Sequence, residues 1–233
     1  MQQTESFGEP DHMMKTETLS IPVGNDHVSG IVSYTEPSKD KTGIIIAHGA
    51  GNDMHNPLIV SVADGLSDSG YLTLRFNFPY TEKGKRAPDP QKNLVQTWQS
   101  VYQFLKENYD PSGIIAAGKS MGGRVVSQMV AEGFEVDRLI FFGYPLHPPN
   151  KKEKLRDAHL YEIKIPMLFF AGTRDSLCDM ELLNRVLKRL TASWFLEIIE
   201  GGDHSFKVPK SMNLTQQEVY DQILKKTIAW LKS

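Results

Sequence analysis

Six short apolar runs alternate with segments of helical periodicity along most of the chain, and this alternation constrains the fold more than any other feature. The apolar runs, each bounded by Gly, Pro, Asp or Asn, predict buried strands at residues 42–47, 71–76, 113–117, 139–142, 167–171 and 194–199. Apolar residues three or four positions apart predict helices at residues 58–69, 93–108, 122–132, 180–190 and 214–231. The remaining long stretches, residues 77–91 and 144–165, are expected to be loops, the second with a short helix around residues 152–159.

Strand and helix in alternation indicate βαβ crossovers, and therefore a mostly parallel sheet with helices on both faces. The segment 16–33 differs, because its apolar residues alternate with polar ones on either side of the turn Gly24-Asn25-Asp26. This pattern predicts an antiparallel hairpin at the sheet edge. We therefore expect an α/β fold in a single domain over residues 16–233, preceded by a flexible N-terminal segment of residues 1–15.

Ser120 lies between a predicted strand and a predicted helix, in the G-x-S-x-G sequence that runs from Gly118 to Gly122. This strand-turn-helix context is typical of a nucleophile elbow, in which the two glycines make room for a sharp turn. A serine that only caps the helix is one alternative. Another is a phosphate-binding P-loop, since residues 113–120 also fit G-x-x-x-x-G-K-S, although the apolar run within them suits a buried strand better than an open loop.

A serine nucleophile needs a base and an acid, and the chain holds candidates in the order Ser, acid, His that α/β-hydrolases use. His204 follows the last predicted strand after two glycines and is the expected base. Asp175 follows the strand at 167–171 and is the expected acid, with Asp179 as a substitute and Asp203 as a less suitable one.

The expected oxyanion hole has two backbone amides. One is that of Met121, directly after the serine, and the other is that of Ala50, in the small-residue stretch after the first strand of the parallel series. Gly49 and Gly51 are alternatives to Ala50. We expect His48 to hold this loop in place rather than to act as a base, because His204 already fills that role.

Four motifs in this order and spacing resemble those of the α/β-hydrolases: His48 to Gly51, Gly118 to Gly123, Gly172 to Asp175 and Gly202 to Phe206. Within that superfamily the chain is similar to the dienelactone-hydrolase-like group that includes testis-expressed protein 30 and the third subunit of the NSL histone-acetyltransferase regulatory complex. The stretch from Phe141 to Pro149, followed by Lys154-Leu155-Arg156, is similar to that group as well. The resemblance implies an α/β-hydrolase fold without a large cap domain, and an acyl-transfer activity.

The nucleophile distinguishes this chain from dienelactone hydrolases proper. The resemblance implies a cysteine at the elbow of those enzymes, whereas this chain has Ser120 there. The only cysteine, Cys178, lies outside the elbow and is expected to be a small packed residue. The sequence therefore predicts a serine hydrolase for small ester or thioester substrates, of the carboxylesterase type. A scaffold that retains the fold for protein binding, and a peptidase, are the alternatives.

Side chains near the predicted strand ends are candidates for the substrate-binding surface. They are His48, Gly49, Phe78, Tyr80, Tyr144 and His147, with Pro79 and Leu146 beside them and core packing as the alternative for each. Lys83, Lys85 and Arg86 are expected to be solvated loop residues that could also attract an anionic substrate. Lys119, beside the serine, is expected to be exposed at the turn.

Several classes of function are disfavoured by composition. The formal net charge of −2 and the pI near 6.4 provide no basic surface for nucleic acid. The acidic N-terminal stretch lacks the apolar core of a signal peptide, and no apolar run is long enough to cross a membrane, so we expect a cytoplasmic protein. No metal site is expected, because His48 and His55 lack accompanying ligands, and no cofactor is expected. Oligomeric state is not predicted.

Overall fold

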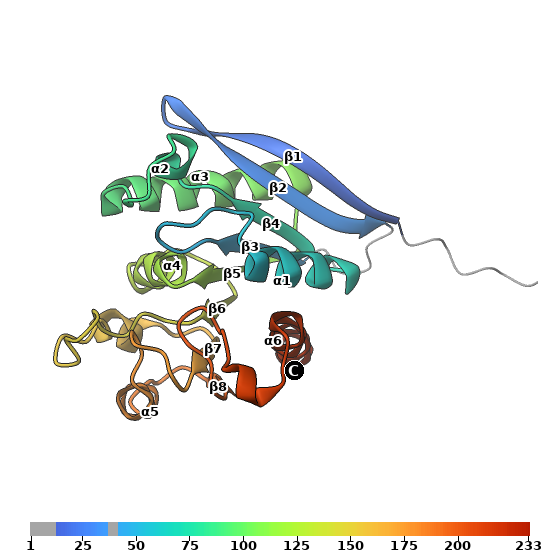
Figure 1. Cartoon of the computed structure of the whole chain (residues 1–233). Coiled ribbons are helices and arrows are strands. Elements are labelled where there is room, and N and C mark those ends of the chain that lie inside the picture. The colour runs from blue at the N-terminus through green and yellow to red at the C-terminus, as the bar shows by residue number, and fades with distance from the viewer. Residues whose placement is uncertain (1–12, 37–41) are drawn as a thin grey trace, which may run out of the picture.

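The computed structural model describes residues 13–36 and 42–233, and within them eight strands form one sheet (Figure 1). In chain order the strands are β1 (Met13–Val23), β2 (Asp26–Glu36), β3 (Thr42–Ala47), β4 (Leu72–Phe76), β5 (Gly113–Lys119), β6 (Arg138–Phe142), β7 (Met167–Gly172) and β8 (Trp194–Ile199). Their order across the sheet is β1-β2-β4-β3-β5-β6-β7-β8. β2 pairs antiparallel with β1 and β4, and the later pairs are parallel, which confirms the predicted sheet and its N-terminal hairpin.

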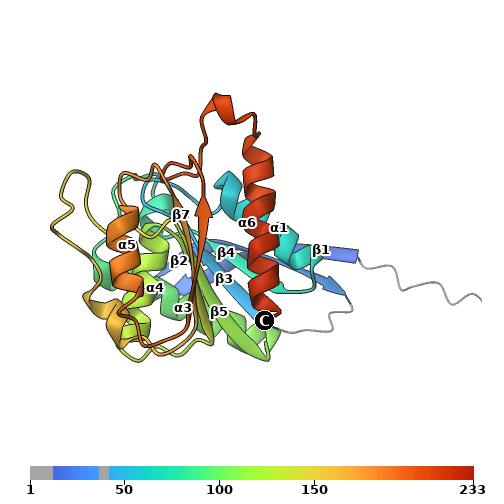
Figure 2. The same cartoon turned by 90° about the horizontal axis from the view of Figure 1, so that it is seen from below.

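Helices cover both faces of the sheet, as Figure 2 shows. α1 (Pro57–Asp68) and α6 (Gln216–Leu231) pack on one face. α3 (Gln91–Tyr109), α4 (Met121–Ala131) and α5 (Met180–Leu187) pack on the other. Successive strand residues contribute to opposite cores: Ile44 and Ile46 pack towards α1, and Ile45 packs towards α3. Burial on both faces explains why these strands are continuously apolar.

The strand order places the loops of the candidate site together. β3 lies at the centre with β4 on one side and β5 on the other, so the chain reverses its direction of progress across the sheet at this point. Because β3 to β8 run parallel, their carboxyl ends share one edge of the sheet. Ligand sites of open α/β sheets form at such a reversal, outside the carboxyl ends of the strands.

The structure differs from the sequence-based expectation mainly in the loops. The helix expected around residues 152–159 is instead a 3-10 turn, η1 (Ala158–Glu162), because residues 151–155 are exposed whereas Leu160 and Ile163 reach the core. The long loop at 77–91 contains a short helix, α2 (Pro79–Glu82), that was not predicted. A second 3-10 turn, η2 (Lys210–Met212), precedes α6.

The expected flexible N-terminal segment falls almost wholly outside the described residues, which begin at Met13. Its last three residues, 13–15, belong to β1 and pair with residues 34–36 of β2. The first strand therefore begins three residues earlier than the expected domain boundary.

Candidate active site

Ser120 occupies the sharp turn between β5 and α4. Its backbone has φ 50° and ψ −112°, in the left-handed half of conformational space that a residue with a Cβ rarely adopts. The turn is held at both ends, because the Ser120 N–H donates to the Phe142 carbonyl at 3.2 Å and the Ser120 carbonyl accepts from the Arg124 N–H at 3.0 Å. A strained residue of this kind persists where the surrounding structure holds it, commonly at a functional site.

The glycines of the turn are required by close backbone contacts. A Cβ atom on Gly118 would collide with the backbone of Gly122 and Gly123, and one on Gly122 would lie 2.7 Å from the His48 carbonyl oxygen. Residues 113–119 form a strand rather than an open loop, which contradicts the P-loop alternative. The local structure is that of a strand-turn-helix elbow with the serine at its tip.

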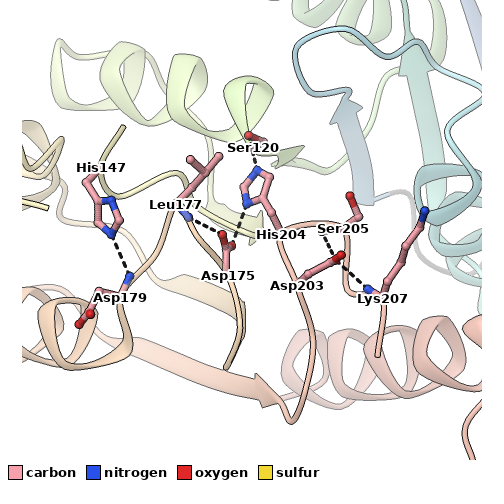
Figure 3. Close-up of polar contacts among 9 residues, drawn as sticks. All are labelled: Ser120, His147, Asp175, Leu177, Asp179, Asp203, His204, Ser205 and Lys207. Carbon is pink, nitrogen blue, oxygen red and sulfur yellow. Dashed lines mark hydrogen bonds and ion pairs between the residues drawn. The ribbon is translucent and has the colours of Figure 1, made fainter. Parts of the chain in front are cut away.

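Asp175, His204 and Ser120 form one hydrogen-bonded chain (Figure 3). His204 Nδ1 lies 2.8 Å from Asp175 Oδ2, and His204 Nε2 lies 2.8 Å from Ser120 Oγ. An ionised carboxylate can only accept, so Nδ1 carries the proton and the lone pair of Nε2 faces the serine hydroxyl. The arrangement orients the imidazole to take the proton of Ser120.

The Asp175 side chain is fully buried, whereas that of His204 is 23% exposed. Asp175 Oδ1 accepts a hydrogen bond of 2.7 Å from the Leu177 N–H, so both carboxylate oxygens have partners. Buried and doubly bonded, the carboxylate has one orientation, and that orientation faces His204. The sequence did not predict that the Leu177 N–H would bond the acid, because every loop residue other than proline carries the same backbone donor.

The two other candidate acids have different roles. Asp179 caps α5 by accepting from the Glu181 and Leu182 N–H groups, and it pairs with Lys152 at 2.5 Å. Asp203 accepts from the backbone N–H groups of Ser205 and Lys207 at 2.8 and 2.9 Å, which closes the loop that carries His204 (Figure 3). Within the described residues, Asp175 alone of the three is hydrogen-bonded to the imidazole.

The loops that carry the acid and the base touch each other through glycines. A Cβ atom on Gly172 would collide with the Gly202 carbonyl, and that carbonyl accepts a 2.8 Å hydrogen bond from the Arg174 N–H. Phe206 anchors the far end of the histidine loop in the core beside α6 and adopts φ 58°. Glycine at position 172 is what allows the loop that carries Asp175 to approach the histidine loop this closely.

The expected oxyanion donors lie at the same edge of the sheet. Met121 is the first residue of α4, where the first N–H groups of a helix have no partner within it. Gly49, in the loop after β3, packs against the serine, since a Cβ atom there would lie 3.4 Å from the Ser120 Cβ. Ala50 is exposed beside it. The assignment of Met121 and Ala50 as oxyanion donors stays a prediction.

His48 supports the loop after β3 from its buried side. Its ring is fully buried, with Nδ1 2.9 Å from the Gly49 carbonyl and Nε2 accepting from the Phe78 N–H at 3.1 Å. Burial lowers the pKa of His48, which keeps the ring neutral and suits one donating and one accepting nitrogen. This is the structural role expected for His48.

The other side chains expected at the substrate surface are also buried in this structure. Phe78 and Tyr80 are fully buried, and the Tyr80 hydroxyl donates to the Gly49 carbonyl at 3.3 Å. Tyr144 is 2% exposed and donates to the Arg156 carbonyl at 2.7 Å, while His147 is 1% exposed and accepts from the Asp179 N–H at 3.1 Å. These residues therefore support the loops from inside the protein. Their side chains are too buried to contact a substrate directly.

Charged residues near the site also differ from expectation. Lys119 is 7% exposed rather than exposed at the turn, and burial lowers its pKa to about 8. The sequence could have predicted this burial. Side chains alternate along β5, so Lys119 lies on the same face as Ile115 and Ala117, which pack against α1 and α6. Lys83 pairs with Asp26 at 2.5 Å, in keeping with a solvated loop residue.

Cys178 is a packed residue, as expected. It is 2% exposed, and burial raises the pKa of its thiol far above the usual range. We predict that the native protein does not react with Ellman's reagent and that one thiol per chain reacts after unfolding in guanidinium. Rapid reaction of the native protein would contradict this placement. The guanidinium-free native sample at the same pH is the control.

Groups of three or more His, Cys, Asp or Glu side chains able to hold a metal do not occur among residues 13–36 and 42–233. Within the same residues, none of the helices is both long enough and apolar enough to span a bilayer.

Comparison with known proteins agrees with the geometry. The family model described as "Alpha/beta hydrolase domain" matches residues 40–232. Similar solved structures include an alpha-beta serine hydrolase homologue from Coxiella burnetii, with TM-score 0.73, 17% identity, and 90% of this chain and 96% of that one covered. A dienelactone hydrolase from Anabaena variabilis aligns with TM-score 0.73, 20% identity and coverage of 95% and 98%.

A third similar structure, XC6422 from Xanthomonas campestris, is described as a serine hydrolase without lid. It aligns with TM-score 0.67 and 20% identity over 82% of this chain and 87% of that one. At such identities the three structures show a shared fold. The match of the family model over most of the chain, together with the elbow and the sheet order, shows that this chain belongs to the alpha/beta hydrolase family.

Proposed function

We propose that this protein is a serine hydrolase that cleaves small ester or thioester substrates through an acyl-enzyme intermediate. The observation that carries the proposal is the hydrogen-bonded chain from the buried Asp175 through His204 to Ser120, with 2.8 Å at both His204 nitrogens. A serine hydroxyl becomes a competent nucleophile when a base is positioned to take its proton.

In the first half of the reaction, Ser120 Oγ attacks the carbonyl carbon while its proton moves to His204 Nε2. The imidazolium that forms is stabilised by the Asp175 carboxylate on Nδ1. The negative charge on the former carbonyl oxygen is held by the amides of Met121 and Ala50, each donor worth about a hundred- to a thousandfold in rate. His204 then gives its proton to the leaving alcohol or thiol, and the acyl group stays on Ser120.

In the second half, water enters where the leaving group was. His204 Nε2 takes a proton from this water as its oxygen attacks the acyl carbon, and the same oxyanion donors hold the second tetrahedral intermediate. The proton then returns to Ser120 Oγ as the acid product leaves. No metal ion or organic cofactor enters the proposed steps.

A short acyl chain is proposed because little chain is available to cover the site. The connection between β6 and β7 spans residues 143–166, and its only regular element is the 3-10 turn η1. An open site contacts a small substrate well and leaves a long acyl chain in water. We also propose that the protein is cytoplasmic. We further propose that it belongs to the narrower group that includes testis-expressed protein 30 and the NSL subunit.

The test combines an active-site probe with a substrate panel. We expect a fluorophosphonate probe to label the folded protein and peptide mapping to place the label on Ser120. Among p-nitrophenyl esters of increasing chain length, acetate and butyrate should have the highest kcat/KM. Aminopeptidase substrates measured alongside should not be cleaved.

Two results would overturn the proposal in different ways. A folded protein that neither takes the probe nor hydrolyses any ester would indicate the non-catalytic scaffold. Turnover of peptides without turnover of esters would indicate a peptidase instead. Comparing a butyryl thioester with the butyryl oxygen ester distinguishes thioester from ester substrates within the proposal.

A further inference from the structure

Arg124 and Arg156 are two half-buried arginines that the proposed mechanism does not use. Arg124 lies in α4, and Arg156 lies in the connection between β6 and β7. Within the described residues, neither guanidinium forms an ion pair with a carboxylate. Asp157, the acid next to Arg156 in sequence, instead accepts from the Tyr161 hydroxyl at 2.6 Å. The chain itself therefore supplies no counter-charge in contact with either arginine.

The two positive charges act on each other. Burial, and then the neighbouring Arg156 charge, lower the pKa of Arg124. Both guanidinium groups also favour the ionised form of the Tyr144 hydroxyl, so they act on the same side chain from two elements. Like charges that are partly withdrawn from water oppose each other, and an anion between them turns this repulsion into attraction.

A hydrogen-bonded network fixes the backbone at both arginines. The Ser127 hydroxyl donates to the Arg124 carbonyl at 2.8 Å. The Tyr144 hydroxyl donates to the Arg156 carbonyl at 2.7 Å. Both hydroxyl oxygens also lie beside His159 Nε2, at 2.8 and 3.1 Å. Since each hydroxyl has already donated its one proton, Nε2 carries a hydrogen and donates to both oxygens. One network of three side chains thus ties α4 to the connection that carries Arg156.

The guanidinium hydrogens are accessible to a ligand. Within the described residues, the hydrogen-bond partner of this pair is Gln128, whose Oε1 accepts from Arg124 Nη1 at 3.3 Å. The same oxygen accepts from Gln91 Nε2 at 3.0 Å. The buried side-chain nitrogens and oxygens that lack a partner belong to other residues. The unpaired nitrogens of Arg124 and Arg156 are therefore reached by solvent.

The pair lies at the same edge of the sheet as the candidate active site. α4 follows β5 and the connection follows β6, so both begin at the carboxyl ends of parallel strands. Arg124 is one helical turn after the nucleophile, since its N–H donates to the Ser120 carbonyl at 3.0 Å. Residues four apart on a helix have Cβ atoms about 5–6 Å apart. An anion bound at Arg124 is therefore separated by only a few bonds from an ester carbonyl at Ser120.

We propose that Arg124 and Arg156 form an anion subsite that binds a phosphate group on the alcohol or thiol part of the substrate. Arginine makes bidentate hydrogen bonds with phosphate. A phosphate monoester carries nearly two negative charges at neutral pH and so balances two guanidinium groups, whereas a carboxylate balances one. The phosphate is assigned to the alcohol or thiol because the acyl part is short in the proposed function. This substrate assignment rests on the proposed function, whereas the binding of phosphate does not.

The direct test is calorimetric titration of the full chain with inorganic phosphate at constant ionic strength. We expect saturable binding by the wild type, weakened about tenfold to a hundredfold in Arg124→Gln and in Arg156→Gln, because each loses a hydrogen bond from a charged group. Arg185→Gln is the matched control and should bind like the wild type, since Arg185 is an exposed arginine in the last turn of α5. Acetate should bind more weakly than phosphate.

A pair of substrates tests the consequence for specificity. 2-Phosphoethyl butyrate and 2-hydroxyethyl butyrate have the same ester bond and differ in the phosphate, which lies a few bonds from the carbonyl. We expect the wild type to favour the phosphorylated ester by about tenfold or more in kcat/KM, the same hydrogen-bond contribution. In Arg124→Gln and in Arg156→Gln this ratio should fall towards one.

The possible failures are distinguishable. Absence of saturable phosphate binding by the wild type, or unchanged binding in both folded variants, would overturn the subsite. Acetate binding as tight as that of phosphate would overturn the assignment to phosphate. If phosphate binds through the two arginines but no ester is hydrolysed, the proposed function fails and the subsite stands.

A measurement on the wild type covers the case in which the variants do not fold. Phenylglyoxal modifies accessible guanidinium groups, and peptide mapping locates the modified residues. Phosphate should slow modification of Arg124 and Arg156 and leave that of Arg185 unchanged. Equal modification of the two arginines with and without phosphate would contradict the subsite.

Discussion

Replacing Ser120 with alanine is expected to lower kcat for ester hydrolysis by about a millionfold while leaving the fold intact. Ser120 Oγ is the atom that His204 Nε2 faces at 2.8 Å, and alanine offers no nucleophile there. Alanine has a Cβ like serine, so the strain of φ 50° is unchanged and no new collision arises. The residual rate, about a thousandfold to ten-thousandfold over water, would come from binding and the oxyanion donors.

The measurement is kcat for p-nitrophenyl butyrate, with thermal unfolding recorded for each variant. Ser205→Ala is the matched control, since Ser205 is an exposed serine next to the base and its Oγ has no part in the proposed steps. Wild-type activity in Ser205→Ala and near-complete loss in Ser120→Ala are expected. Substantial activity in folded Ser120→Ala would assign the nucleophile elsewhere.

Asp175→Asn is expected to lower kcat by about ten-thousandfold, the size of the effect in serine proteases. The new side chain can keep its oxygen on the Leu177 N–H, where the wild-type Oδ1 accepts at 2.7 Å. Its NH2 group then faces His204 Nδ1, at the place of the 2.8 Å contact with Oδ2. Two donors cannot pair, so the imidazole proton moves to Nε2 and the nitrogen that faces Ser120 can no longer accept.

The control for this variant is Asp179→Asn, at the aspartate that was the alternative acid. Asp179 caps α5 through Oδ1, and asparagine caps a helix about as well as aspartate. We expect Asp179→Asn to retain wild-type kcat within about threefold, allowing for the exposed pair with Lys152. A large loss in Asp179→Asn with little loss in Asp175→Asn would reverse the assignment of the acid.

Most of the parallel sheet was predictable from local pattern. The apolar run at 42–47 coincides with β3, because a strand buried on both faces must be apolar throughout and turn residues mark its ends. The run at 194–199 coincides with β8, although this edge strand leaves Phe195 and Ile198 exposed. Loops were harder to predict. The turn η1 forms where Leu160 and Ile163 reach the core, and which apolar loop residues do so depends on packing against α4 rather than on local sequence.

By itself, the sequence determined the class of fold, the elbow at Ser120 and the order of the candidate acid and base, because these depend on periodicity, on glycines and on position after a strand. Only the tertiary structure decided that Asp175 rather than Asp203 faces His204, and that the Lys119 side chain is buried. It also decided that the buried Tyr80 hydroxyl bonds the loop after β3 and that the buried Tyr144 hydroxyl bonds the connection between β6 and β7. The physical reason is that the direction and exposure of a side chain are set by neighbours distant in sequence, which no local pattern records.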